Sequence, residues 1–458
     1  MNRSSSLKQK VYGAAMAALL TVGLISESEA ITMQEATLEN GMRVIIVPDH
    51  RSPVVLHSVW FQAGSVDEAE GVTGIAHMLE HMMFKSTKNR TNEEREKLIQ
   101  RNGAQENAFT SRDYTAYYQK VAKDRLGLMM DQEADRMVNL ALTDEVFQPE
   151  RKVVLEERQL RTESNPVNRF YEKLVSKHFG KHPYEHPVIG WREDIEGYKL
   201  QDNLDWYNTH YAPNNATMIL VGDITLDEAL PMVKKHYGDL KPAETPKRKL
   251  PEQPLREEEV RFVEVDKDVQ VPLFVQFYRA PSAQAKVAGI HGDTADAPAL
   301  EVLADILGGG QTSRLYKALV TEQKIADSAS SGYDETGAGE SSIDVYAQPK
   351  PDVTLDRIEK AVDDVIAELL KKGVTEDEVS RSIMALKSSH VYGQDDLFNT
   401  VYRLGLWLMA GGDTKGYNAY IGKVESVTKG DVLRVAKKYF VKQHRTTGLL
   451  VAEESQLK

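Results

Sequence analysis

The chain has 458 residues, of which 41% are hydrophobic and 28% are charged, and it contains no cysteine. This length suits two large domains better than one. The lack of cysteine excludes disulfide bonds, thiolate metal ligands and a cysteine nucleophile. The formal net charge of −12 disfavours nucleic acid and anionic membranes as partners.

The first 30 residues have the pattern of a secretory signal peptide. Arg3, Lys8 and Lys10 give a basic start, and an uncharged, mostly apolar run follows at 11–25. Small residues then precede a cleavage site that we predict after Ala30. The alternative, a membrane anchor, needs about 20 apolar residues, which is longer than this run. We therefore expect a soluble mature chain in the bacterial periplasm.

The sequence after residue 30 repeats itself weakly, which predicts two related domains. Residues 43–65 and 261–282 each read as two β-rich runs joined by a polar turn. The ends of the two halves, 210–223 and 438–454, also resemble each other. The helical stretches expected in between include 118–141, 144–163 and 298–307.

A linker is predicted between the two halves. Residues 241–259 contain four prolines and many charged side chains, a composition typical of a connecting segment. After the signal peptide at 1–30 we therefore expect two α/β domains, each a sheet covered by helices. Their bounds are about 31–240 and 257–458, with the linker at 241–256.

The segment HMLEH at 77–81 predicts a metal site. On a helix, His77 and His81 project from one face a turn apart, which is the spacing of two ligands of one zinc ion. Glu80 shares that face and is placed to act as the base on a water at the metal. The neighbouring residues are nearly all apolar, so the helix should be buried, where unpaired imidazoles would cost free energy. The alternative is a core helix with incidental histidines, which the spacing disfavours.

Glu157 is the predicted third ligand, because a catalytic zinc takes three protein ligands and keeps one open position. If residues 148–161 are helical, Glu157 shares an apolar face with Glu150, Val153 and Val154. Glu156 falls on the solvated side and should form only exposed charge pairs. Glu150, two turns before Glu157, suits a supporting role such as orienting a histidine.

The second half offers an internal comparison. Its segment 298–308 aligns with 74–84 and should form the equivalent helix. The positions of the metal motif are occupied there by Glu301, Ala304 and Asp305. The second half is therefore expected to lack the metal chemistry of the first.

The histidine motif at 77–81 and the glutamate motif at 150–157 together resemble the pitrilysin family of zinc peptidases. The resemblance is closest to the branch of that family that includes the mitochondrial processing peptidase β-subunit. The family combines H-x-x-E-H with E-R-x-x-V-x-x-E, which here runs from Glu150 to Glu157. The resemblance covers nearly the whole chain after residue 30. Further matching segments lie at 105–118, 181–190, 211–223 and 308–319.

The resemblance implies a fold, a reaction and a set of roles. It implies two related domains with mainly antiparallel sheets that form half of a clamshell, and one zinc ion per chain. It also implies hydrolysis of short or unfolded peptides, with Glu157 as zinc ligand and Glu150 as a supporting acid. Asn107, Ala108 and Phe109 match the family's edge strand, which pairs with the substrate backbone.

One departure from the family bears on assembly. Active members carry an arginine and a tyrosine that contact the substrate, and this chain has Val320 and Asp327 at those positions. Either the alignment shifts at this point or this subunit is incomplete. In the second case we expect it to be the metal-bearing half of a heterodimer whose related subunit supplies the arginine and tyrosine. Two alternatives stay open, a non-catalytic scaffold and a subunit that binds peptides without cutting them.

Overall fold

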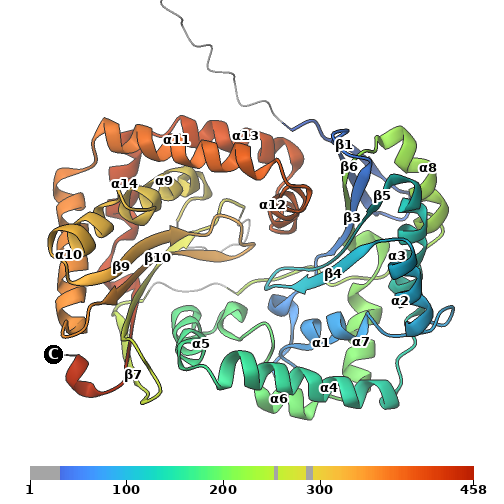
Figure 1. Ribbon diagram of the computed structural model, residues 1–458, viewed down its shortest axis with the longest axis horizontal. Helices are drawn as coiled ribbons and strands as arrows, with labels where there is room; N and C mark the ends of the chain where they lie inside the picture. Colours follow the sequence, from blue (N-terminus) through green and yellow to red (C-terminus); the bar gives the residue numbers. More distant parts are fainter. Residues whose placement is uncertain (1–30, 252–255, 285–291, 458) are drawn as a thin grey trace, which may run out of the picture. The chain divides into compact units, whose positions relative to one another are not determined.

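Figure 1 shows the computed structural model, which describes residues 31–251, 256–284 and 292–457. The predicted signal peptide at 1–30 lies outside these residues, as does part of the predicted linker, 252–255. Residues 31–458 group into one compact unit, so the domain bounds at 240 and 257 stay predictions. Among the described helices, none is both long enough and apolar enough to span a membrane.

The first sheet has six strands and lies within the first half of the chain. Its strand order is β1 (Gln34–Thr37), β2 (Arg43–Pro48), β6 (Ala216–Gly222), β3 (Val54–Phe61), β5 (Thr115–Ala122) and β4 (Gln105–Thr110). β2 and β6 pair in parallel, and the other described pairs are antiparallel. β4 is an edge strand, so its outer side is available to another chain.

The second sheet has five strands and repeats the connectivity of the first. Its order is β7 (Val260–Val265), β11 (Arg445–Val451), β8 (Leu273–Pro281), β10 (Glu340–Pro349) and β9 (Ala326–Tyr333). β7 pairs in parallel with β11, as β2 does with β6, and the remaining pairs are antiparallel. The predicted doubled α/β fold with mainly antiparallel sheets is thus confirmed.

Helices cover both sheets. Those of the first half are α1 (Ile75–Met82), α2 (Asn92–Arg101), α3 (Leu126–Asn139), α4 (Asp144–Arg158), α5 (Pro166–Phe179), α6 (Arg192–Gly197), α7 (Leu200–His210) and α8 (Leu226–Tyr237). Those of the second half are α9 (Ala297–Gly308), α10 (Leu355–Lys372), α11 (Glu376–Gly393), α12 (Leu397–Met409), α13 (Thr414–Glu425) and α14 (Lys429–Tyr439). Short 3₁₀ helices lie at Ser65–Asp67, Lys123–Arg125, Pro183–Glu185, Pro213–Asn215, Thr294–Asp296, Lys442–His444 and Glu454–Gln456, and π-helical turns at Gln159–Glu163 and Tyr316–Glu322.

The helix predicted at 118–141 is wrong at its start. Residues 118–122 are the end of β5, and helix α3 begins only at Leu126. β5 pairs with β3 on one side and β4 on the other, and its aromatic and β-branched residues suit that position. The stretch 144–163 is helical as predicted, although α4 ends at Arg158 and a π-helical turn continues it.

Each half of the chain covers one face of the other half's sheet (Figure 1). α12 packs on the first sheet, where Leu404 and Trp407 join the buried Trp60 of β3. α5 packs on the second sheet, where Phe170 and Leu174 join residues of β8 and β11. The opposite faces are covered by helices of their own half, including α1, α3, α7 and α8 for the first sheet and α9, α10 and α14 for the second.

Two glycines permit these exchanged contacts. A Cβ on Gly405 of α12 would lie 2.2 Å from the ring of Trp60, and one on Gly448 of β11 would lie 2.8 Å from the ring of Phe170. Both rings are fully buried. Neither ring can move away without disturbing the close packing around it.

Gly405→Ala should lower the free energy of unfolding by about 3 kcal/mol, because the added methyl group overlaps the Trp60 ring. Gly422→Ala in α13 is the matched control, since nothing lies within 4 Å of its added Cβ. Alanine there should instead stabilise the helix by ~0.5–1 kcal/mol. Chemical denaturation measures both variants, and equal stability of the two would contradict the packing described.

Candidate metal centre

The helix that carries the HMLEH motif, α1, starts at a turn that requires glycine. Gly74 has a φ of 87°, and a Cβ there would lie 2.2 Å from the carbonyl oxygen of Ile189. The two oxygens of Glu68 accept hydrogen bonds from the backbone amides of Gly74 (2.7 Å) and Ala76 (2.9 Å). This carboxylate satisfies amides at the helix N-terminus and interacts favourably with the helix dipole.

Glu68 is held in turn by His186. Nε2 of His186 lies 3.2 Å from Glu68 and 2.8 Å from the carbonyl oxygen of Ser65. Burial raises the pKa of Glu68. Burial acts against protonation of His186, but the hydrogen bond and charge of Glu68 outweigh it and raise the pKa of His186. Glu68 escaped prediction because it lies six residues before Gly74, farther than the usual capping residues.

α1 and α4 bring the three predicted ligands together. The Nε2 atoms of His77 and His81 lie 3.8 Å and 3.2 Å from the same oxygen of Glu157, Oε2. One ligand atom from each residue lies within 4.8 Å of the other two. Within 31–251, 256–284 and 292–457 this is the one such group of three or more ligand-type side chains. Two imidazole nitrogens and one carboxylate oxygen suit zinc, which takes such donors and can keep a fourth position open.

Glu150 and Arg161 fix the orientation of these ligands. Oε1 of Glu150 lies 2.8 Å from Nδ1 of His81, which directs Nε2 towards Glu157, and Lys85 donates to the other oxygen of Glu150. Arg161 pairs with Oε1 of Glu157 at 2.7 Å, so Oε2 is left for the histidines. Lys85 was not predicted, because its role depends on how α4 meets α1. Arg161 lies four residues after Glu157 on the same helical stretch, a spacing that could have been read from the sequence but was not singled out.

The inner face of α4 differs from the expectation at one position. Val153, expected beside Glu150 and Glu157, is 45% exposed, whereas Val154 is fully buried. The buried residues of this helix are Phe147, Val154 and Arg158. The apolar face is therefore narrower than predicted and leaves Val153 at its border. Glu156 is exposed, as predicted.

The contacts of the site shift the pKa values of its groups in different directions. Burial, together with the charge of His81, lowers the pKa of His77 to about 4. Burial also opposes protonation of His81, but hydrogen bonds to Glu150 and Glu157 outweigh it and raise its pKa to about 9. Hydrogen bonds with His81 lower the pKa of both glutamates. The carboxylates are thus held ionised, the form that binds a metal.

Glu80 lies next to the ligands and is bound by a residue of the edge strand. Thr110, the last residue of β4, donates a hydrogen bond of 2.6 Å to Oε2 of Glu80. Burial raises the pKa of Glu80. A raised pKa suits a carboxylate that has to accept a proton and return it. Thr110 was not singled out from the sequence.

The predicted substrate-binding residues lie on β4, at the edge of the first sheet. Asn107 is exposed, and its Oδ1 accepts a hydrogen bond of 2.9 Å from the amide of Ala108. The ring of Phe109 packs against Trp60 and Tyr402, at centroid distances of 5.2 Å and 5.5 Å. The Phe109 side chain therefore packs between the first sheet and α12, while the backbone of β4 lies at the edge.

The second half has the equivalent helix, as predicted. α9 follows β8 as α1 follows β3, and it carries Glu301 and Asp305 in place of the histidines. Val320 packs against the core of the second sheet. Asp327 lies on β9, 3.7 Å from Nζ of Lys350.

Comparison with known proteins identifies the family. Residues 43–191 match the family model of insulinase (peptidase family M16), and residues 198–386 match that of the peptidase M16 inactive domain. Zinc protease PqqE of Helicobacter pylori is 30% identical over 451 residues, which cover 96% of this chain and 98% of that protein. The chain belongs to peptidase family M16. This is the pitrilysin family, and the naming of such relatives as zinc proteases supports zinc as the metal.

Solved structures agree with this M16 assignment. The crystal structure of a protease from Helicobacter pylori matches with a TM-score of 0.82 and 29% identity, covering 92% of this chain and 99% of that one. The periplasmic protease PqqL from Escherichia coli shares the fold, with a TM-score of 0.78 and 19% identity. That match covers 93% of this chain but 48% of PqqL.

Glu157→Gln should reduce bound zinc well below the wild-type content, because a neutral amide oxygen is a weaker ligand than a carboxylate. Glu156→Gln is the matched control, since its side chain is exposed on the other side of α4. Elemental analysis of the dialysed proteins measures the zinc. Wild-type zinc content in Glu157→Gln would contradict the assignment.

Proposed function

We propose that this chain is a zinc-dependent endopeptidase subunit in which His77, His81 and Glu157 hold one zinc ion per chain. The observation that carries the proposal is the approach of one Glu157 oxygen to both histidine Nε2 atoms, at 3.8 Å and 3.2 Å. A set of nitrogen and oxygen donors this close, in a half-buried place, is suited to a bound cation.

The residues around the ligands support peptide hydrolysis. Zinc bound there would lower the pKa of a water molecule towards ~7 and polarise the scissile carbonyl group. Glu80 takes the proton of the attacking water and returns it to the leaving amine. Thr110 holds the Glu80 carboxylate in place, and Glu150 keeps Nδ1 of His81 occupied so that Nε2 faces the metal.

Short or unfolded peptides are the substrates that this geometry favours. A peptide could pair as an added strand with the free edge of β4, beside Asn107 and Ala108. Such a peptide would then pass close to Thr110 at the end of β4 and to Glu80, which Thr110 contacts. Such pairing needs an extended segment, which a folded protein rarely offers.

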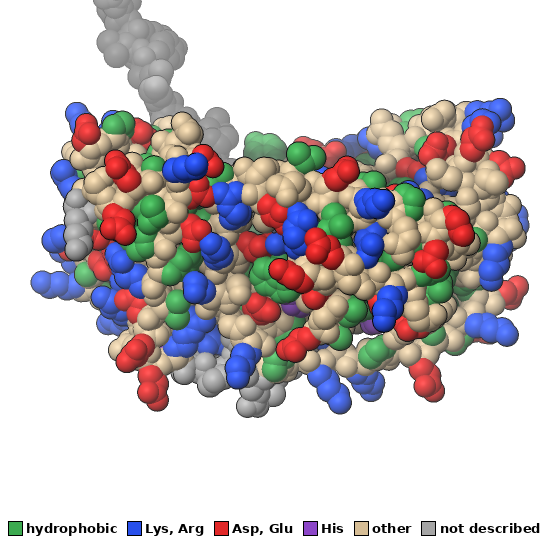
Figure 2. All heavy atoms as spheres, turned by 90° about the horizontal axis from the view of Figure 1, so that it is seen from below, with side chains coloured by type: hydrophobic (Ala, Val, Ile, Leu, Met, Phe, Trp, Pro, Cys, Tyr) green, Lys and Arg blue, Asp and Glu red, His purple; other side chains and the backbone are tan. Residues whose placement is uncertain are grey.

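Figure 2 shows acidic and basic side chains interspersed on the face drawn, without the continuous basic area typical of nucleic-acid binding.

A non-catalytic scaffold or peptide-binding subunit of the same family is the second candidate. It is favoured by Val320 and Asp327, which the resemblance to the family aligns with the substrate-contacting arginine and tyrosine of active members. The retained ligand set and Glu80 favour the peptidase. Zinc-dependent cleavage that requires Glu80 separates the two candidates.

Glu80→Gln should keep the zinc and abolish peptide cleavage, because it removes a proton acceptor and leaves the three ligands in place. Zinc analysis and a mixed peptide digest followed by mass spectrometry measure the two properties on the same sample. Undiminished cleavage by this variant would exclude Glu80 as the base. Loss of zinc together with activity would instead assign Glu80 to the metal ligands.

The chain is proposed to work as one half of a heterodimer. Its fold matches about half of the longer PqqL chain, so a second chain of the same kind would complete a four-domain arrangement. A homodimer would repeat Val320 and Asp327 in both copies and leave the substrate without the arginine and tyrosine. A related subunit that lacks H-x-x-E-H but carries that pair would supply what this chain lacks.

Adding such a partner should raise peptide cleavage at least about 100- to 1,000-fold over the isolated chain, because each donor to the transition state usually contributes that much and the partner supplies two. The assay compares the chain alone, the partner alone and the mixture at equal zinc. The mixture made with Glu80→Gln is the control and should stay inactive. Full activity of the isolated chain, unchanged by the partner, would refute the heterodimer.

The proposed location is the bacterial periplasm. The basic and apolar start of the sequence supports export, and PqqL, which shares the fold, is described as periplasmic. N-terminal sequencing of the exported protein should begin at Ile31. A full-length chain retained in the cytoplasm would contradict the proposal.

A further inference from the structure

A cavity of about 470 Å³ opens where β4 ends and β5 begins. Its lining comes from the β4–β5 turn (111–114), the end of α5 with the segment after it (179–188), the β9–β10 turn with the start of β10 (334–342), and α12. Thr110, which bonds Glu80, immediately precedes the first of these segments. At ~3.3 Å per residue, a peptide strand paired with β4 would reach the cavity two or three residues from the cleaved bond.

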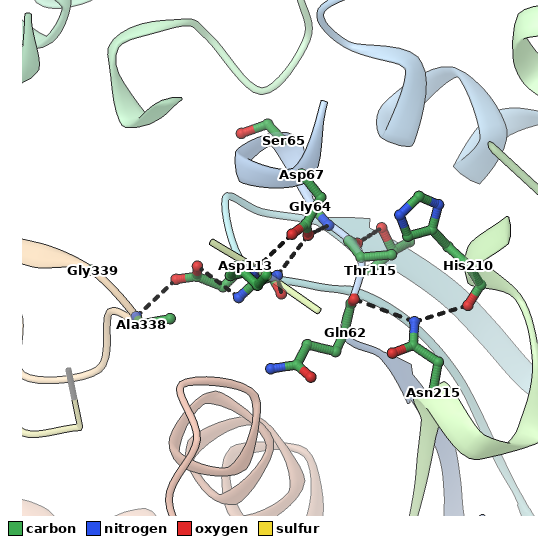
Figure 3. Close-up of polar contacts among 12 residues, drawn as sticks. Gln62, Gly64, Ser65, Asp67, Asp113, Thr115, His210, Asn215, Ala338 and Gly339 are labelled. Atoms are coloured by element: carbon green, nitrogen blue, oxygen red, sulfur yellow. Dashed lines mark hydrogen bonds and ion pairs between the residues drawn. The ribbon is translucent and has the colours of Figure 1, made fainter. Parts of the chain in front are cut away.

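One side of the cavity is fixed by a buried polar network (Figure 3). Oδ2 of Asp113 accepts hydrogen bonds from the hydroxyl of Tyr184 (2.6 Å) and the amide of Ala338 (3.1 Å). The second bond, drawn in Figure 3, joins the β4–β5 turn to the β9–β10 turn. Arg248 donates to Oδ1 of Asp113 at 3.1 Å and also pairs with Asp67. The charge of Asp113 is therefore compensated, and the wall it forms is held in place.

The other acids of the cavity differ in their partners. Glu340 is paired with the buried Arg279. Asp334 accepts two hydrogen bonds from Thr336, at 2.9 Å and 2.7 Å, and forms no ion pair with the residues that the structure describes. Asp334 is thus the one acidic group of the described lining whose charge is not neutralised by a cation.

Arg112 is the one cationic side chain among the described residues that line this cavity. Its guanidinium carbon lies 5.1 Å from the ring centroids of both Phe179 and Tyr184. The guanidinium group makes no hydrogen bond or ion pair with any described residue, although it carries five N–H donors. The two rings restrain its orientation through cation–π contacts and leave N–H groups free to bind an acceptor.

We propose that Arg112 binds a carboxylate of the peptide and gives the enzyme a preference for substrates with a negative charge close to the cleaved bond. This inference rests on the proposed function, because it places the peptide along β4. The carboxylate is either the peptide C-terminus or an Asp or Glu side chain, since a guanidinium group binds both in the same bidentate way.

Four peptides of one sequence distinguish the two sources. They carry either Glu or Gln two or three residues from the cleaved bond, and either a free or an amidated C-terminus. Dissociation constants are measured by fluorescence anisotropy in the zinc-loaded Glu80→Gln variant, and kcat/KM in the zinc-loaded enzyme with its partner. The same measurements are made after Arg112→Gln, Arg112→Lys and Asp334→Asn.

A recognised carboxylate should tighten binding at least about tenfold relative to its neutral counterpart, as charged hydrogen bonds typically do. Arg112→Gln should bring that ratio close to one, and Arg112→Lys should keep only part of it because lysine cannot bind in a bidentate way. Asp334→Asn should increase the affinity ratio between the carboxylate peptide and its neutral counterpart, since it removes a negative charge that repels the carboxylate.

An unchanged ratio after Arg112→Gln, or an equal loss of affinity for all four peptides, would assign Arg112 to packing and overturn the inference. A smaller ratio after Asp334→Asn would also count against it. If carboxylate peptides bind in an Arg112-dependent way but the enzyme cuts none of them, the inference stands and the proposed peptidase function fails.

Discussion

Oxygen Oε2 of Glu157 lies between two imidazoles of α1, and much of the surrounding structure keeps it there. Arg161 occupies the other oxygen of Glu157, and Glu150 orients the ring of His81. The position of α1 itself depends on the carboxylate of Glu68 at its N-terminus and on the turn at Gly74. Each of these contacts compensates a charge or amide that would be costly to leave unpaired in a half-buried place.

The two halves of the chain also hold each other, because α12 packs on the first sheet and α5 packs on the second. α12 covers the face of the first sheet that is turned towards the second half, and Phe109 of β4 packs between that sheet and Tyr402 of α12. The edge strand that leads to Glu80 is therefore held by the second half, although the second half has no metal motif of its own. The cavity around Arg112 lies at the same junction, since Tyr402 and Leu406 of α12 also line it.

Local patterns in the sequence predicted the centre of the site. The four-residue spacing of His77 and His81 and the helical face of Glu157 follow from the periodicity of a helix, which tertiary contacts rarely change. Thr110 could not be predicted in this way, because it acts across a contact between β4 and α1, and Glu68 reaches the start of α1 from six residues before Gly74. Arg161 lies four residues after Glu157 on the same helical stretch, so helix periodicity could have found it, but it was not singled out. The helix predicted at 118–141 was wrong at its start because pairing in the sheet decided residues 118–122. The packing of α5 and α12 on the sheet of the other half was not predicted, because it depends on contacts between distant parts of the chain.

The central claim is that one zinc ion lies between His77, His81 and Glu157. X-ray diffraction from crystals of the zinc-loaded protein, recorded above and below the zinc absorption edge, tests it directly. The account predicts one anomalous peak per chain, ~2.0–2.2 Å from a nitrogen of each histidine and an oxygen of Glu157, and none at Glu301 and Asp305. A peak bonded to other residues, or no peak at these three, would contradict it.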